Sequence, residues 1–369
     1  MKDRPWYRAG VAIAAGALLA AVMAAPVLAQ PTPKRNAELQ KLIDEAKKEK
    51  RLQISISTPR QDATIKALIA GFKAHWGLND IDVVWSSRGS VEGVSVLQVE
   101  AKAGRQTVDV QSVTPTMIPG LISVNALKPY DWVGVFGEEL PEIKQYFQQV
   151  PADFRGLVLA FYDTAYATGY NTKMITNVAE VPGSLEEFAN PRWRDKFAID
   201  GTSWTGLSQQ THVIGPEATL ALAKRILENR PLIQNGPAAT HNAIVTGAVP
   251  IGLTHTRATC LDQRRKAPIE MKFWKVMPTD VLLTAPTVTG GAPNAARLWT
   301  AWMVTKGQPI VRQGECLEFT MDPDSDIHKR ISKEIAPAKP QFVWPSNDKA
   351  AREEDEVRKK LTTLLQTMK

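Results

Sequence analysis

Leu52-Gln-Ile-Ser-Ile-Ser57 opens the stretch of sequence that decides the fold. Apolar and polar residues alternate in it, and a period of two predicts a β-strand with one better-buried face. Thr58-Pro59 interrupts this strand, and residues spaced as the apolar stripe of a helix follow. These residues are Ile65, Leu68, Ile69, Phe72 and Trp76. Gly77 then ends the helix in the manner of a C′ glycine.

The strand-then-helix pattern continues to residue 110. A second strand is expected at residues 81–85, a second helix carries Val91, Val94, Leu97 and Ala101, and a third strand is expected at 108–110. An order of β-α-β-α-β with short links predicts a parallel sheet with right-handed crossovers. In such sheets ligands bind outside the carboxyl ends of the strands.

Hydroxyl side chains and one arginine gather at these strand ends. The candidate ligand-binding residues of the first half of the chain are Ser57, Thr58, Ser87, Arg88, Ser112 and Thr114. All lie near predicted helix starts, so capping of the helices by Ser and Thr is the alternative explanation.

The second half of the chain shows the same pattern of strands that end in hydroxyl side chains and an arginine. Strands are expected at 196–199 and 249–253, and a strand at 281–289 is expected to return to the first lobe. The candidate residues at the two strand ends of this half are Thr202, Ser203, Trp204, Thr254, His255 and Arg257. For Trp204 a buried core position is the alternative.

The N-terminus has the pattern of a secretory signal peptide. Lys2, Arg4 and Arg8 precede an apolar run at 9–25, and small residues precede Gln30. Cleavage is predicted after residue 29; an uncleaved anchor is the alternative, although the apolar run is short for a membrane span. Without residues 1–29, the 369-residue chain still has a length for which two lobes are expected.

Charge and cysteine content narrow the possible functions. The formal net charge of +7 is spread among interleaved acids, and no basic run with aromatic residues indicates a nucleic-acid partner. Cys260 and Cys316 allow one disulfide in an exported protein, or two free core thiols. There is no Cys-x-x-Cys, and the five histidines lack ligand spacing, so neither a metal site nor a cofactor is expected.

Four motifs in order carry a family resemblance. They are Val99-Glu-Ala-Lys-Ala-Gly104 followed by Val108-Asp-Val110, Gly169-Tyr-Asn-Thr-Lys173, Pro182-Gly-Ser-Leu-Glu-Glu-Phe188 with Asn190-Pro-Arg-Trp193, and Ala292-Pro-Asn-Ala-Ala-Arg-Leu-Trp299 with Lys306-Gly-Gln308. Over about residues 50–310 the chain resembles the family 1 extracellular solute-binding proteins of ABC importers. The nearest branch is the ferric-iron type, with its thiamine, polyamine and phosphonate relatives.

The resemblance implies an α/β protein with the type II periplasmic-binding-protein fold. Each lobe would be a mixed, mostly parallel sheet flanked by helices, and two hinge crossings would join the lobes. The expected lobes are 30–155 with 280–369, and 156–279. The resemblance further implies a periplasmic monomer that closes on a ligand in its cleft and delivers it to an inner-membrane ABC permease.

The expected ligand is a small anionic organic solute such as a carboxylate or phosphonate. Iron-binding members carry adjacent tyrosines after the strand that is here 249–253, whereas this chain has Thr254-His-Thr-Arg257. Tyr162 and Tyr166 are expected to be core residues. Helix N-termini, with Arg88 and Arg257, are expected to bind the anion. Surface salt bridges are the alternative for both arginines.

Other function classes stay open at this point. An iron-, polyamine- or thiamine-binding member and a receptor for a membrane sensor are alternatives to the anion carrier. An exported hydrolase is a further alternative. However, the chain has no Gly-x-Ser-x-Gly elbow, and His255 beside Thr254 or Thr256 is its only candidate base and nucleophile pair.

Overall fold

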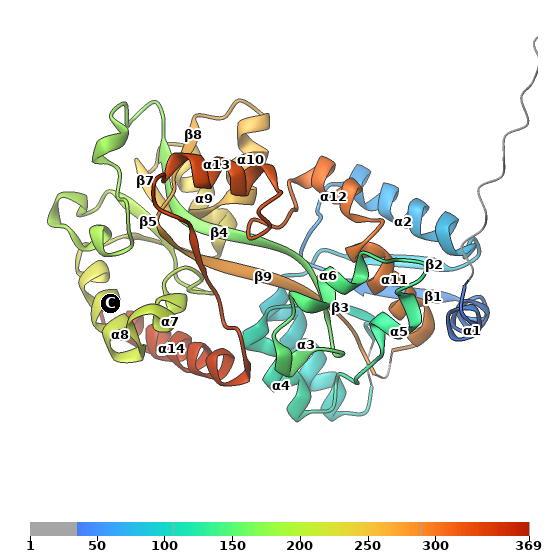
Figure 1. Ribbon diagram of the computed structural model, residues 1–369. Coiled ribbons are helices and arrows are strands. Elements are labelled where there is room, and N and C mark those ends of the chain that lie inside the picture. The colour runs from blue at the N-terminus through green and yellow to red at the C-terminus, as the bar shows by residue number, and fades with distance from the viewer. Residues whose placement is uncertain (1–34, 106, 289, 369) are drawn as a thin grey trace, which may run out of the picture. The chain divides into compact units, whose positions relative to one another are not determined.

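The computed structural model describes residues 35–105, 107–288 and 290–368 (Figure 1). The predicted signal peptide, 1–29, lies outside these ranges. Among the described residues, no helix combines the length and the apolar character that a membrane crossing requires.

The strands form one mixed sheet with the order β2-β1-β3-β9-β4-β7-β5-β6, in which β10 pairs with β9 and β8 pairs with β4. Their bounds are β1 Arg51–Ser55, β2 Asp82–Ser86, β3 Val110–Val113, β4 Leu159–Asn171, β5 Phe197–Asp200, β6 Leu232–Gln234, β7 Ile251–His255, β8 Ile269–Lys272, β9 Val276–Pro286 and β10 Gln341–Val343.

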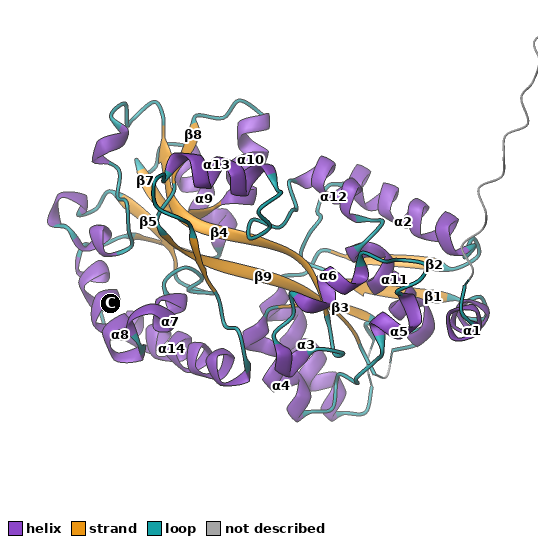
Figure 2. Cartoon of the chain, in the orientation of Figure 1, coloured by secondary structure: helices purple, strands orange, loops and turns teal. Residues whose placement is uncertain are grey.

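Helices cover both faces of the sheet (Figure 2). The α-helices of the described residues are α1 Ala37–Ala46, α2 Asp62–Trp76, α3 Ser90–Lys102, α4 Ile118–Ser123, α5 Trp132–Phe136, α6 Ile143–Gln148, α7 Thr211–Ile214, α8 Pro216–Glu228, α9 Pro237–Val245, α10 Thr256–Arg264, α11 Pro293–Val304, α12 Gln308–Glu315, α13 Asp326–Glu334 and α14 Asp348–Thr367.

The predicted β-α-β-α-β unit is confirmed. β1 pairs in parallel with both β2 and β3, and α2 and α3 connect the three strands. The third strand begins at Val110 instead of residue 108. Just before this strand, the buried Asp109 carboxylate accepts the Gln53 and Ala292 backbone N–H groups at 2.7 and 2.9 Å, which anchors the strand start to its neighbours.

Two long strands join the halves of the molecule. β4 and β9 pair antiparallel from Leu159↔Thr284 to Ala165↔Thr279, and they run side by side between the two groups of helices (Figure 1). One end of β4 packs through Leu159 and Phe161 in a first apolar cluster, whereas Ala165 and Tyr166 lie in a second cluster. These strands are the two expected crossings.

The C-terminal helix packs on the second cluster. Val357 and Leu361 of α14 are buried with residues of β4, β5 and α8, although they belong to the range 280–369 that was expected in the first lobe. Glu354 fixes this contact, because its fully buried carboxylate accepts from Ser208 Oγ at 3.0 Å, His212 Nε2 at 2.9 Å and Arg358 Nη2 at 2.8 Å. The lobe boundaries themselves stay a prediction.

Candidate functional site

The crossing strands form the floor of a cavity of about 480 Å³, a size suited to a small solute. Tyr166 of β4 lies opposite His255 of β7, and Thr164 of β4 lies opposite Asp280 of β9. Directly paired residues of antiparallel strands share one face of the sheet, and Thr164 and Tyr166 share it because they are two residues apart. All four residues line the cavity.

Several strand-end candidates line the walls of this cavity. They are Ser57, Thr58, Thr114, Thr202, Ser203, His255 and Arg257. Four of their hydroxyls are already engaged. Thr58 Oγ1 bonds the Tyr162 hydroxyl at 2.8 Å, Thr114 Oγ1 bonds Thr116 Oγ1 at 3.0 Å, and Thr202 and Ser203 both donate to Asp200. Contact of these residues with a ligand stays a prediction.

Three further candidates serve the protein's own hydrogen bonding and do not line the cavity. Ser112 Oγ accepts from the Ser57 backbone N–H at 3.1 Å, and Thr254 Oγ1 bonds His241 Nδ1 at 2.8 Å. Ser87 Oγ accepts from Trp85 Nε1 at 3.0 Å. Their hydroxyls therefore position neighbouring loops and side chains.

The two remaining candidates also lie outside the cavity lining. Trp204 is 1% exposed, and its Nε1 donates to Thr362 Oγ1 of α14 at 3.0 Å, as expected of a core tryptophan. Arg88 forms a partly exposed ion pair with Glu92, one helical turn along α3, at 3.5 Å. Trp204 therefore lies in the core and Arg88 forms a surface salt bridge, which were the alternatives to ligand binding for these two residues.

Arg257 lines the cavity, but its charge is neutralised inside the protein. Its Nη2 donates to Glu315, whose side chain is 1% exposed. The Glu315 carboxylate also accepts the backbone N–H groups of Arg60 and Gln61, at the start of α2. A helix start that was expected to attract a solute anion therefore already holds the protein's own carboxylate.

The other charged residues of the wall are mostly paired as well. Arg265 lies 3.3 Å from Asp262, which also bonds His241 at 2.8 Å. Arg358 donates to Glu354 at 2.8 Å, and its remaining contacts are Ser208 and Thr116. Groups other than these paired arginines must therefore provide any electrostatic attraction of a solute.

His255 presents a hydrogen-bond donor to the cavity. The side chain is 8% exposed, and its Nδ1 accepts the Ala258 backbone N–H at 3.3 Å. Burial, and after it the charges of Arg257 and His241, holds the pKa of His255 well below its usual value. A neutral ring that accepts at Nδ1 carries its proton on Nε2, and Nε2 has no partner among the described residues.

Asp280 is the least compensated charge of the floor. No hydrogen bond or ion pair joins its carboxylate to any described residue, and burial raises its pKa to about 6. Since this value exceeds that of the unfolded chain, ionised Asp280 destabilises the folded state as pH rises from about 4 through about 6.

Asp280→Asn is therefore expected to raise the free energy of unfolding by about 1–3 kcal/mol at pH 7.5 and to change it little at pH 4. Urea denaturation of both proteins at the two pH values measures this difference. Asp80→Asn, at an exposed site outside the cavity, removes the same charge and serves as the control. If Asp280→Asn changed the free energy of unfolding equally at both pH values, the raised pKa assigned to Asp280 would be contradicted.

Apart from His255, sequence reasoning missed the polar residues of the floor. Tyr162 and Tyr166 were expected in the core; they are buried, but both also line the cavity, as do Asp280 and Glu315. A usable signal was present, since Tyr162, Thr164 and Tyr166 put three hydroxyls on one face of a strand. Across the described ranges, no three His, Cys, Asp or Glu side chains lie together in a way that could hold a metal ion.

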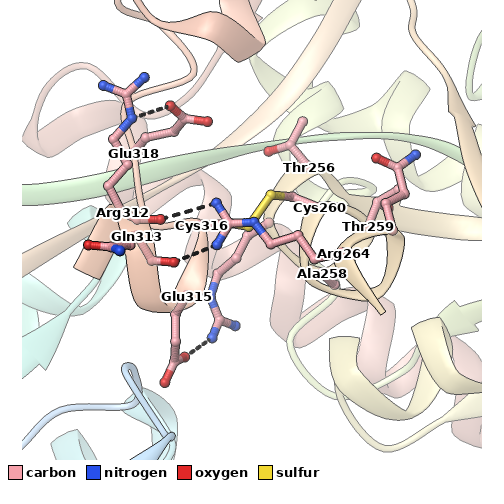
Figure 3. The surroundings of a disulfide bond; sticks show 12 residues. Thr256, Ala258, Thr259, Cys260, Arg264, Arg312, Gln313, Glu315, Cys316 and Glu318 are labelled. Carbon is pink, nitrogen blue, oxygen red and sulfur yellow. Dashed lines mark hydrogen bonds and ion pairs between the residues drawn. A yellow bond between two sulfur atoms is a disulfide. The ribbon is translucent and has the colours of Figure 1, made fainter. Parts of the chain in front are cut away.

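A disulfide lies beside the site. Cys260 of α10 is bonded to Cys316, at the end of α12, so the disulfide alternative is the one present (Figure 3). Arg264 reinforces the contact by donating to the Gln313 carbonyl at 2.6 Å. Since α10 packs on β7 and β8 and α12 packs on α2, the disulfide ties the two halves of the molecule together beside the cavity.

No protein-family model and no curated protein matches this chain. Solved structures do match. Iron-bound HitA from Pseudomonas aeruginosa is 16% identical, with 85% of this chain and 99% of that chain covered and a TM-score of 0.65. The periplasmic binding protein AfuA from Actinobacillus pleuropneumoniae, with fructose-6-phosphate bound, is 16% identical over 85% and 96%, with a TM-score of 0.64.

A third match is the substrate binding protein of an ABC transporter from Agrobacterium tumefaciens. It is 12% identical, with 86% of this chain and 95% of that chain covered and a TM-score of 0.65. At these identities the likeness shows the fold. The chain therefore has the two-lobed type II fold of periplasmic binding proteins, and the predicted fold class is confirmed.

Proposed function

We propose that this protein is the periplasmic solute-binding component of an ABC importer, and that as a monomer it delivers a small solute to an inner-membrane permease. The observation that carries the proposal is the cavity where β4, β7 and β9 meet, lined by residues of both halves of the chain. A solute held there contacts both lobes, so its binding can favour a closed form.

The solute of this proposal bears an anionic group. The N-termini of α3 and α9 face the cavity through Gly89, Ser90, Val91, Pro237 and Ala238, and neither helix has a side-chain cap. Their free N–H groups and helix dipoles attract an anion. Arg88 and Arg257 have a smaller part in this proposal than the sequence suggested, because each is paired with a glutamate.

Release of the solute unchanged is also part of the proposal. A hydrolase needs a nucleophile activated by a base. Here the Thr254 hydroxyl bonds His241, the Thr256 hydroxyl bonds Thr164 at 2.9 Å, and His255 Nδ1 accepts a backbone N–H. Neither of the threonine hydroxyls beside His255 in the sequence bonds its ring, so this candidate pair gives no support to a hydrolase.

A thermal-shift screen of small carboxylates, phosphonates, sugar phosphates, amino acids, polyamines and ferric citrate tests this function. At a concentration one hundred times its Kd, a bound solute adds about 2.7 kcal/mol to folded-state stability, and we expect one class to raise the Tm by several degrees. Mass spectrometry should recover that solute intact. Absence of any shift, or recovery of a reaction product, would contradict the proposal.

A further inference from the structure

The charges that line the cavity nearly all have partners within the protein. Arg257, Arg265 and Arg358 pair with Glu315, Asp262 and Glu354 respectively. Among the described lining residues this leaves one cation and one anion without an ionic partner, Arg60 and Asp280. The two unpaired charges have opposite signs.

Asp280 has a second polar group beside it. Tyr166 is 3% exposed, lines the cavity, and its hydroxyl makes no hydrogen bond to the described residues. Asp280 lies diagonally across the β4–β9 pair from it, and after burial the Asp280 charge is the largest cause that raises the pKa of Tyr166. A carboxylate and a phenol oxygen that face the same space form an acceptor pair for an N–H-bearing cation.

Arg60 is the unpaired positive charge of the cavity lining. It is exposed at the start of α2, and its Nε donates to the Ser57 carbonyl at 3.1 Å, which leaves the outer guanidinium N–H groups free of partners among the described residues. The uncapped N-terminus of α3 lines the same first-lobe wall. On the floor, His255 Nε2 is a further donor. These groups suit the oxygen atoms of an anion.

We propose that the solute is a zwitterion whose ammonium or similar cationic nitrogen lies on Asp280 and Tyr166, while its carboxylate or other anionic group lies toward Arg60 and the α3 N-terminus. This inference rests on the proposed function and names its substrate class. A doubly anionic solute would add negative charge beside Asp280, and Arg358, the cation that acts on Asp280, is already paired with Glu354. A doubly cationic solute would instead leave Arg60 facing a second positive charge.

A set of three six-carbon compounds of equal length tests the charge pattern. These are 6-aminohexanoate, adipate and 1,6-diaminohexane. Each of them, and each of the twenty amino acids, is tested separately by thermal shift and then by calorimetric titration. We expect zwitterions to bind, and 6-aminohexanoate to bind at least tenfold more tightly than adipate or the diamine. Asp280→Asn and Arg60→Gln should each weaken binding of the best zwitterion by about tenfold or more. Asp80→Asn should leave its Kd unchanged.

The outcomes separate this inference from the proposed function. Tighter binding of adipate, of another solute without a cationic nitrogen, or of the diamine would overturn the zwitterion while the carrier function stands. So would an unchanged Kd in Asp280→Asn, or binding of ferric ion with the visible absorption of an iron–phenolate bond. If no solute of the wider screen binds, the carrier function fails first.

Discussion

Replacing Glu315 by alanine is expected to lower the free energy of unfolding by about 3–5 kcal/mol. The carboxylate is 1% exposed, neutralises Arg257, and accepts two backbone N–H groups at the start of α2. Its removal leaves a largely buried guanidinium and two helix-end donors without partners. Arg257 Nε already lacks a partner, so the site has no spare acceptor to replace the lost one.

Urea denaturation of the variant and the parent protein measures this loss. Glu142→Ala is the matched control, since its ion pair with Lys306 at 2.7 Å is about half exposed and contributes about 1 kcal/mol or less. A loss for Glu315→Ala no greater than that of the control would contradict the assigned role of Glu315.

Removal of the disulfide is the second large effect. The double variant Cys260→Ser, Cys316→Ser is expected to lose about 4 kcal/mol of stability, because the bond closes a loop with a sequence separation of 56 and so restricts the unfolded chain. Denaturation midpoints of the oxidised parent protein and the double variant measure the loss. Added reductant should lower the midpoint of the parent protein and leave the variant unaffected.

A difference below about 1 kcal/mol between the two proteins would contradict this prediction. Either single serine variant leaves one free thiol, so the double variant is the cleaner comparison. Cys260→Ala, Cys316→Ala should behave in the same way, because the effect comes from loss of the covalent link.

The strands and helices could be predicted from local sequence patterns, because residues close together along the chain determine them. The alternation in 52–57 and the apolar stripe that includes Leu68 and Phe72 depend only on the strand and helix periods, and both elements are present. The rule that ligands lie at strand ends also pointed to this cavity, since Ser57, which follows β1, and His255, the last residue of β7, both line it.

Side-chain partnerships across long sequence separations could not be predicted in this way. Arg257 and Glu315 are 58 residues apart, and no periodicity reveals that they pair. The polar face of β4 was visible in the sequence, but only the register with β7 and β9 shows that Tyr166, His255 and Asp280 share one floor. The partly exposed Arg88 and the buried Trp204 looked alike in sequence, because both lie at hydroxyl-rich strand ends.

The most direct test of the central claim is solute binding to a variant whose cavity is filled. Ala238 is an exposed residue in the first turn of α9 that lines the cavity, whereas Ala70 is an exposed residue of α2 outside it. Calorimetric titration with the solute that gives the largest thermal shift should show Ala238→Trp weakened by at least tenfold and Ala70→Trp equal to the parent protein. Equal affinity in all three proteins would show that the solute binds outside this cavity, and would contradict the account.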